Sequence, residues 1–132
     1  MNQYTIIACP GHFFRVMLRA IRCGNYKLDD FKIVGLTGDL SEKDLLSIAK
    51  NLALSAYLEG PRKGIFAENI ANAFILKGDI TECMNPSRTG VFGKSILSGI
   101  SVTVPNTEDK EEQTVKVYSS EEIRSLENWR NP

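Results

Sequence analysis

The sequence predicts an α/β fold, with α+β as the alternative, built as a single-layer mixed β-sheet packed by helices. Two observations predict it. Short runs of β-branched and apolar residues early in the chain alternate with segments whose apolar residues recur at helical spacing. Two later runs, residues 100–104 and 115–118, alternate apolar and polar residues on either side of a polar turn, which is typical of a β-hairpin. The predicted element order is therefore β-α-β-α-α-β-β-α.

The first strand and the first helix are predicted from the start of the chain. Residues 4–8 form a short β-branched run that ends in a turn at Gly11. A helix follows, because apolar residues recur three and four positions apart until Gly24 stops them. Those residues are Phe13, Phe14, Met17, Leu18 and Ile21. A second strand is expected at residues 31–36.

Two helices are predicted in the middle of the chain. Ser41 suits the N-cap of the first, Asp44 completes a capping box, and Gly60 ends the helix. Its apolar face comprises Leu45, Ile48, Ala49, Leu52 and Ala56. The second helix is expected over residues 65–77, with Gly78 as its C-cap. Its apolar face comprises Phe66, Ile70, Ala73 and Phe74.

The last third of the chain contains a loop, the hairpin and a terminal helix. Asn, Pro, Ser and Gly make residues 82–93 a predicted loop, and residues 105–112 form the polar turn of the hairpin. Ser119 begins the Ser-Ser-Glu-Glu pattern of a capping box. The helix after it places Ile123 and Leu126 on one side.

Composition indicates one domain, residues 1–132, and excludes several classes of protein. A 42% hydrophobic and 24% charged sequence is ordinary for a globular domain. Sixteen basic and sixteen acidic residues give a net charge of zero, so we do not expect nucleic acid as a partner and do expect self-association. No apolar run approaches the about 20 residues of a membrane span, and no signal peptide is evident, so no membrane partner is expected.

The cysteines and the histidine argue against metal. Cys9, Cys23 and Cys83 have neither the spacing of a disulfide framework nor that of a zinc site, which favours a reducing cytoplasm. With a single histidine in the chain, we expect no metal and no other cofactor.

The end of the first strand is the main candidate ligand site. Gly11 allows a ligand close to the backbone, and a helix N-terminus favours an anion. His12, Arg15 and Arg19 follow at helical spacing and share one helix face. Guanidinium groups match the geometry of phosphate, so this stripe predicts a phosphate-binding surface. The alternative is the ordinary solvated face of an amphipathic helix.

Cys9 lies beside this stripe and is a candidate nucleophile. Cys9 and Arg15 have the spacing of a phosphatase loop, but Val16 stands where that loop has a hydroxyl residue. Phe13 and Phe14 also add bulk where the backbone would have to curl round a phosphate. We therefore expect Cys9 to be a buried structural cysteine at the end of a strand.

A second candidate segment is the glycine-containing loop around Arg88 and Lys94. Gly93, Lys94 and Ser95 end like a Walker A loop, but Arg88 stands where its first glycine is required. Nucleotide hydrolysis by this route is therefore excluded. The loop still offers cationic and hydroxyl groups to a phosphate, and the alternative is an ordinary surface loop.

These patterns predict a non-catalytic binding or regulatory protein that is cytoplasmic and homo-oligomeric. It would hold a phosphate-bearing small ligand, such as a nucleotide or a nucleotide-derived signal. The expected ligand-binding residues are Gly11, His12, Arg15, Arg19, Arg88 and Lys94. One alternative is a small hydrolase or transferase acting on a nucleotide or phosphorylated substrate, with His12 as acid–base. Another is an inhibitor or adaptor that docks on a second protein.

Overall fold

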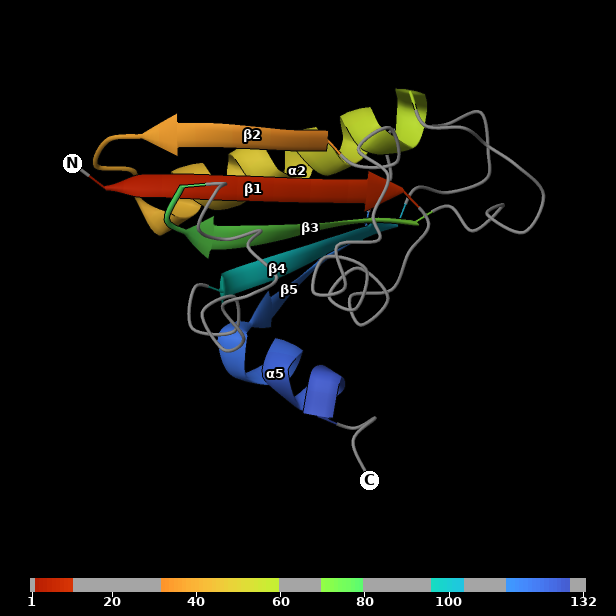
Figure 1. The fold of residues 1–132 in the computed structure, drawn as a ribbon. Coiled ribbons are helices and arrows are strands. Elements are labelled where there is room, and N and C mark those ends of the chain that lie inside the picture. Colours follow the sequence, from red (N-terminus) through yellow and green to blue (C-terminus); the bar gives the residue numbers. More distant parts are fainter. Residues whose placement is uncertain (1, 11–31, 60–69, 80–95, 104–113, 129–132) are drawn as a thin grey trace.

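The computed structural model describes residues 2–10, 32–59, 70–79, 96–103 and 114–128 (Figure 1). The elements in chain order are β1 (Gln3–Pro10), β2 (Lys32–Thr37), α2 (Glu42–Glu59), β3 (Ile70–Lys77), β4 (Ile96–Thr103), β5 (Thr114–Ser119) and α5 (Ser120–Asn128). The strands form one five-stranded sheet in the order β2-β1-β3-β4-β5. A sheet with helices packed against it is therefore confirmed.

The mixed strand direction that the sequence predicts is wrong for these strands. Each pair of neighbours in the sheet is antiparallel, including β1 with β2, which the predicted β-α-β start would have made parallel. The predicted strands at residues 4–8, 31–36, 100–104 and 115–118 correspond to β1, β2, β4 and β5. The first predicted helix, with Phe13 to Ile21, lies outside the described residues.

The helix predicted over residues 65–77 is also wrong, because Ile70–Lys77 is the central strand β3. Six consecutive residues of β3 are buried, since both faces of the strand are covered. An apolar run without alternation fits a buried strand and a buried helix equally well. Gly78, the expected helix C-cap, instead ends this strand.

Two glycines fix the beginning of β1. Gly38 follows β2 and Gly78 follows β3, and both have positive φ, 132° and 122°, which side chains rarely allow. The Gly38 amide donates to the Asn2 carbonyl at 2.9 Å, and the Gly78 amide donates to the Gln3 carbonyl at 2.8 Å. The turns that follow β2 and β3 therefore donate hydrogen bonds to the backbone where β1 begins.

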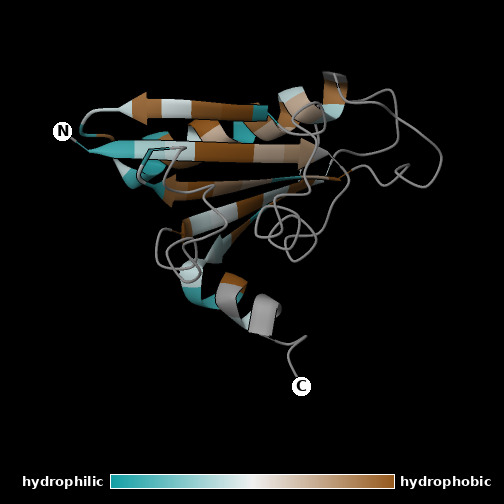
Figure 2. Cartoon of the chain, in the orientation of Figure 1, coloured by the Kyte–Doolittle hydropathy of each residue, from teal (hydrophilic) through white to brown (hydrophobic). Residues whose placement is uncertain are grey.

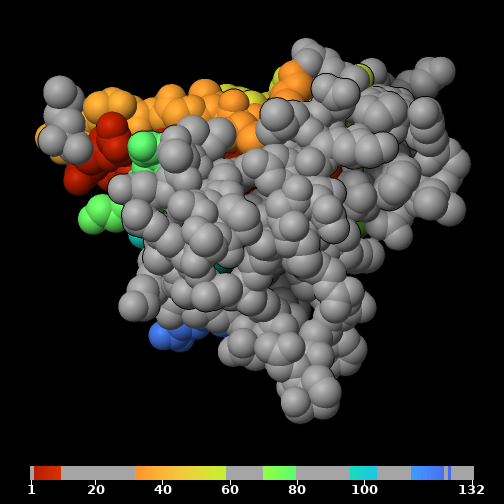
Figure 3. Space-filling model, in the orientation of Figure 1, coloured from red at the N-terminus to blue at the C-terminus, as the bar shows by residue number. Residues whose placement is uncertain are grey.

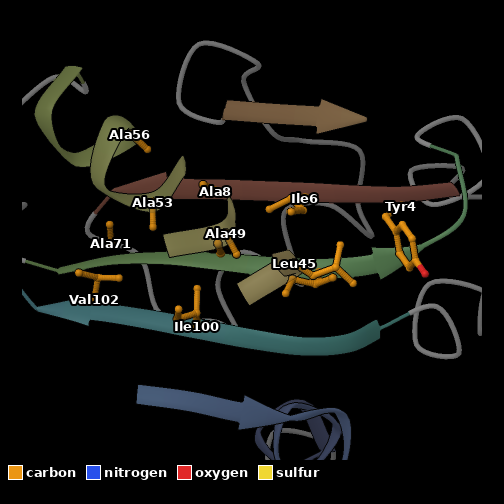
Figure 4. Packing of buried hydrophobic residues seen from close by; sticks show 12 residues of the cluster. Tyr4, Ile6, Ala8, Leu45, Ala49, Ala53, Ala56, Ala71, Ile100 and Val102 are labelled. Atoms are coloured by element: carbon orange, nitrogen blue, oxygen red, sulfur yellow. The ribbon is translucent and has the colours of Figure 1, made fainter. Parts of the chain in front are cut away.

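Helix α2 covers one face of the sheet, over β1, β3 and β4 (Figure 4). Its N-terminus is capped as predicted, because the Asp44 amide donates to Ser41 Oγ at 3.1 Å. The residues that α2 turns toward the strands are mostly small, namely Leu45, Ala49, Ala53 and Ala56, all buried. Small side chains let the helix backbone approach the sheet closely. Lys32 Nζ also donates to Ser55 Oγ at 2.9 Å, which ties β2 to α2.

The opposite face of the sheet carries a second cluster, with Ile123 of α5. The clusters alternate along β1: Ile6 belongs to the α2 cluster and Ile7 to the second. Brown, apolar residues accordingly fill the middle strands in Figure 2. Phe74, fully buried, is the largest side chain of the second cluster.

A bulge in β4 places Ile96 on the α5 face. Ser98 lies opposite Ile75, but the next residue of β3, Leu76, lies opposite Ile96. The additional residue, Leu97, reverses the alternation of faces. Ile96 therefore packs in the cluster of Ile123, while Ile100 packs against α2.

The C-terminal helix begins with the capping box that the sequence predicts. The Glu122 amide donates to Ser119 Oγ, and the Ser119 amide donates to Glu122 Oε1, both at 3.2 Å. This reciprocal pair turns the chain from β5 directly into α5. Ile123 is fully buried as expected, whereas the side chain of Leu126 lies outside the described part.

Neither α2 nor α5, the helices within the described ranges, combines the length and apolar character needed to cross a membrane.

The alanine face of α2 gives a prediction about stability. Ala53→Leu should lower the free energy of unfolding by about 1–3 kcal/mol, because three additional carbon atoms would have to fit between helix and sheet. Asn51→Leu, at an exposed position of the same helix, is the control and should change it by less than about 0.5 kcal/mol. Urea unfolding followed by circular dichroism measures both, and equal stabilities would contradict the close packing of α2.

Candidate functional site

A row of polar side chains crosses four strands of the sheet. Cys9 of β1 lies opposite Asn72 of β3, Asn72 lies opposite Ser101 of β4, and Ser101 lies opposite Lys116 of β5. We call these four residues the polar row. Because directly opposite residues of an antiparallel sheet share a face, all four lie on the face where α5 packs.

Burial decreases along the polar row from β1 to the edge strand β5. Cys9 is fully buried and Asn72 is 4% exposed. Ser101 is half-buried and Lys116 is exposed. The row thus leads from the core to the surface at β5.

Asn72 is the unusual member of the row. It is the one polar residue between Ile70 and Leu76 of the central strand. Among the residues that the structure describes, its side-chain amide has no hydrogen-bond partner. A buried polar group without a partner costs about 1–3 kcal/mol, so such groups in proteins call for an explanation. A ligand that accepts from or donates to this amide would supply one.

The row offers hydrogen-bond donors of three kinds. An amide, a hydroxyl and an ammonium group follow one another from Asn72 to Lys116, and each can donate to an oxyanion. Lys116 Nζ lies 4.9 Å from the centre of the Tyr118 ring, which is the next residue on the same face. The arrangement therefore provides a positive charge at the surface and neutral donors toward the core.

Cys9 occupies the position that the sequence predicts. It is the penultimate residue of β1 and is fully buried. A buried thiol is not accessible to a substrate in solution, so the structural role expected for Cys9 is favoured over a nucleophilic one.

The other predicted site residues lie outside the described part of the chain. They are Gly11, His12, Arg15, Arg19, Arg88 and Lys94. Their relation to the polar row is one of sequence: Gly11 is two residues after Cys9, directly after the last residue of β1. Whether the remaining predicted residues join this site stays a prediction.

Sequence reasoning missed Asn72, Ser101 and Lys116. Ser101 and Lys116 look like ordinary outward residues of a hairpin, and only the register with β3 joins them to Asn72. Asn72 itself carried a signal, because one asparagine interrupts a run of apolar residues from Ile70 to Leu76. That signal was hidden by the expectation of a helix there.

Comparisons with known proteins returned no match to a family model, a curated protein or a solved structure. Within the described ranges there is also no group of three or more His, Cys, Asp or Glu residues placed to hold a metal ion.

The unpaired amide gives a second prediction. Asn72→Leu keeps the branching and the number of heavy atoms but removes the polar group. We expect the ligand-free variant to lose no more than about 1 kcal/mol of unfolding free energy, because the wild-type amide itself costs about 1–3 kcal/mol when unpaired. Asn72→Asp, which introduces a charge at the same buried position, should be destabilised by much more.

Urea unfolding of protein freed of small molecules by denaturation and refolding tests this prediction. A loss above about 3 kcal/mol in Asn72→Leu would mean that the amide is paired within the chain, which removes the reason to place a ligand there.

Proposed function

We propose that this chain is a non-catalytic, homo-oligomeric binding protein that holds a phosphate-bearing small molecule, such as a nucleotide or a nucleotide-derived signal. The observation that carries the proposal is the buried Asn72 amide, unpaired among the described residues and continued by Ser101 and Lys116 toward the surface. A row of donors that ends in an ammonium group at the surface can hold a polar ligand along its length, with an oxyanion at the charged end.

The exposure of each residue suggests how the ligand is placed. The phosphate lies at the exposed end, where Lys116 supplies a charge and Ser101 a hydroxyl. An uncharged polar part of the ligand reaches inward to Asn72, since burying the phosphate itself would cost more free energy than burying a neutral group.

The predicted basic stripe completes this site in the proposal. Gly11 and His12 follow β1 in sequence, at the Cys9 end of the polar row, and in the proposal they bind a further anionic group of the ligand, apart from the phosphate at Lys116. Arg15, Arg19, Arg88 and Lys94 supply the further positive charge that a nucleotide with more than one phosphate would need.

Binding is favoured over catalysis because the row offers donors and no acid–base pair. Its four side chains are a thiol, an amide, a hydroxyl and an ammonium group, and the thiol is fully buried. General acid–base catalysis most often uses an imidazole or carboxyl group within hydrogen-bonding reach of the reacting atom, and the polar row contains neither. In this proposal the ligand is held and released unchanged.

Native mass spectrometry of the protein as purified, compared with its denatured mass, tests the proposal. We expect an additional mass in the range of a nucleotide, which is released and identified on denaturation. Lys116→Met should weaken the binding of that ligand about tenfold or more, the loss of one charge-assisted hydrogen bond. Lys43→Met, which removes an exposed lysine from α2 on the other face, is the matched control and should bind as wild type does.

If the purified protein carries no additional mass and titration with nucleotides gives no heat, the proposal fails. Equal affinity of Lys116→Met and wild type would retain a ligand but exclude the polar row as its site.

His12→Ala distinguishes binding from turnover. We expect the variant to bind the ligand several-fold more weakly and neither variant nor wild type to convert it, as followed by chromatography of the recovered ligand. Conversion by wild type that is lost in His12→Ala, with binding retained, would instead identify an enzyme with His12 as acid–base.

A further inference from the structure

We infer that β5 is the homo-oligomer interface, where it pairs antiparallel with β5 of a second copy of this chain about a two-fold axis. The inference rests on the oligomeric part of the proposed function and not on the ligand. Strand β5 lies at one edge of the sheet, so one side of its backbone has no strand to pair with among the described elements.

The residues of β5 show that this edge is open. Five of its six residues are exposed, and the sixth, Tyr118, is half-buried. Its ladder with β4 is regular from Thr103 opposite Thr114 to Ser98 opposite Ser119, with neither a bulge nor a proline. Bulges and prolines are two of the features by which edge strands avoid pairing with another chain, and β5 has neither.

Two valines make this edge apolar on the α2 face. Val115 is 37% and Val117 46% exposed. They lie opposite Val102 and Ile100, which belong to the core beneath α2. The apolar face of the sheet therefore continues beyond the part that α2 covers.

The other edge of the sheet differs. Strand β2 forms a margin of the molecule (Figure 3), but its apolar Val34 and Leu36 are half-buried against the α2 cluster. Lys32 of β2 also donates a hydrogen bond to Ser55 of α2. Of the two edges, β5 is the one with exposed valines.

A second copy fits this edge because β5 can be complementary to itself. For the valine faces of two copies to be continuous, a residue of β5 must lie opposite the same residue of the partner subunit. With Val117 at that centre, Lys116 faces Tyr118 of the partner subunit, and Tyr118 faces Lys116 of the partner subunit. Within one chain, Lys116 Nζ lies 4.9 Å from the centre of the Tyr118 ring. The pairing between copies would use the same kind of cation–π contact.

A centre at Lys116 is disfavoured, since it would place two ammonium groups directly opposite each other, which is destabilising. Long-range charge does not oppose association either, because each copy has a net charge of zero. Centres nearer either end of β5 would pair fewer of its six residues, so we assign the centre to Val117.

The oligomeric state tests the interface. Analytical ultracentrifugation of wild type should give a concentration-dependent dimer, and Val117→Lys should weaken dimerisation at least tenfold. Leu58→Lys, which replaces an apolar side chain 54% exposed on α2, is the matched control and should dimerise as wild type does. A monomeric wild type, or equal dimerisation of Val117→Lys with an unchanged circular dichroism spectrum, would overturn the inference.

Cysteine crosslinking tests the register. Under mild oxidation Val117→Cys should form a disulfide-linked dimer faster than Lys116→Cys, relative to a wild-type background control. Faster linking of Lys116→Cys would overturn the assigned centre, and linking of neither above background would overturn β5 pairing.

Ligand binding and dimerisation fail separately. Val117 lies on the face opposite the polar row, so Val117→Lys should retain the additional mass in the range of a nucleotide. Asn72→Leu should dimerise as wild type does but carry no such mass.

Discussion

The central strand β3 has to be apolar on both faces, and the rest of the structure follows from that constraint. Its backbone pairs with β1 and β4, while α2 covers one face and a second apolar cluster covers the other. A polar residue in such a strand is largely shielded from water, so the amide of Asn72, which is 4% exposed, needs a hydrogen-bond partner. The bulge at Leu97 contributes to the burial of β3, because it turns Ile96 toward the face on which α5 packs.

The elements that could be predicted from the sequence are those whose signal is local. Ser41 and Ser119 cap helices through atoms three residues away, and the alternation in β4 and β5 reflects neighbours along the strand. Strand β3 was not predicted, because burial on both faces removes the alternation of apolar and polar residues that marks a strand. The antiparallel pairing of β4 with β5 is the direction expected of the predicted hairpin. The direction of β2 relative to β1 was not predicted correctly, because the long segment between the two strands gives no local signal for it.

The candidate site divides in the same way. A basic stripe is visible as spacing along the chain, but the polar row exists only across the strands. Ser101 and Lys116 lie more than 25 positions after Asn72, and Cys9 lies more than 60 positions before it. No local pattern joins them. The one local clue was an asparagine among apolar residues, and its meaning required knowing that the segment is a strand. The proposed site therefore combines a charge pattern read along the sequence with donors aligned by the sheet.

The strand order β2-β1-β3-β4-β5 also determines how the sheet can grow during synthesis on the ribosome. Strands β1 and β2 emerge first and can pair, and α2 follows to cover them. After that, each strand joins beside the one made before it or beside β1: β3 at β1, β4 at β3 and β5 at β4. The sheet thus extends in one direction, from a single growing margin, in the order in which the chain is translated. No completed strand has to separate from a neighbour to admit a later one.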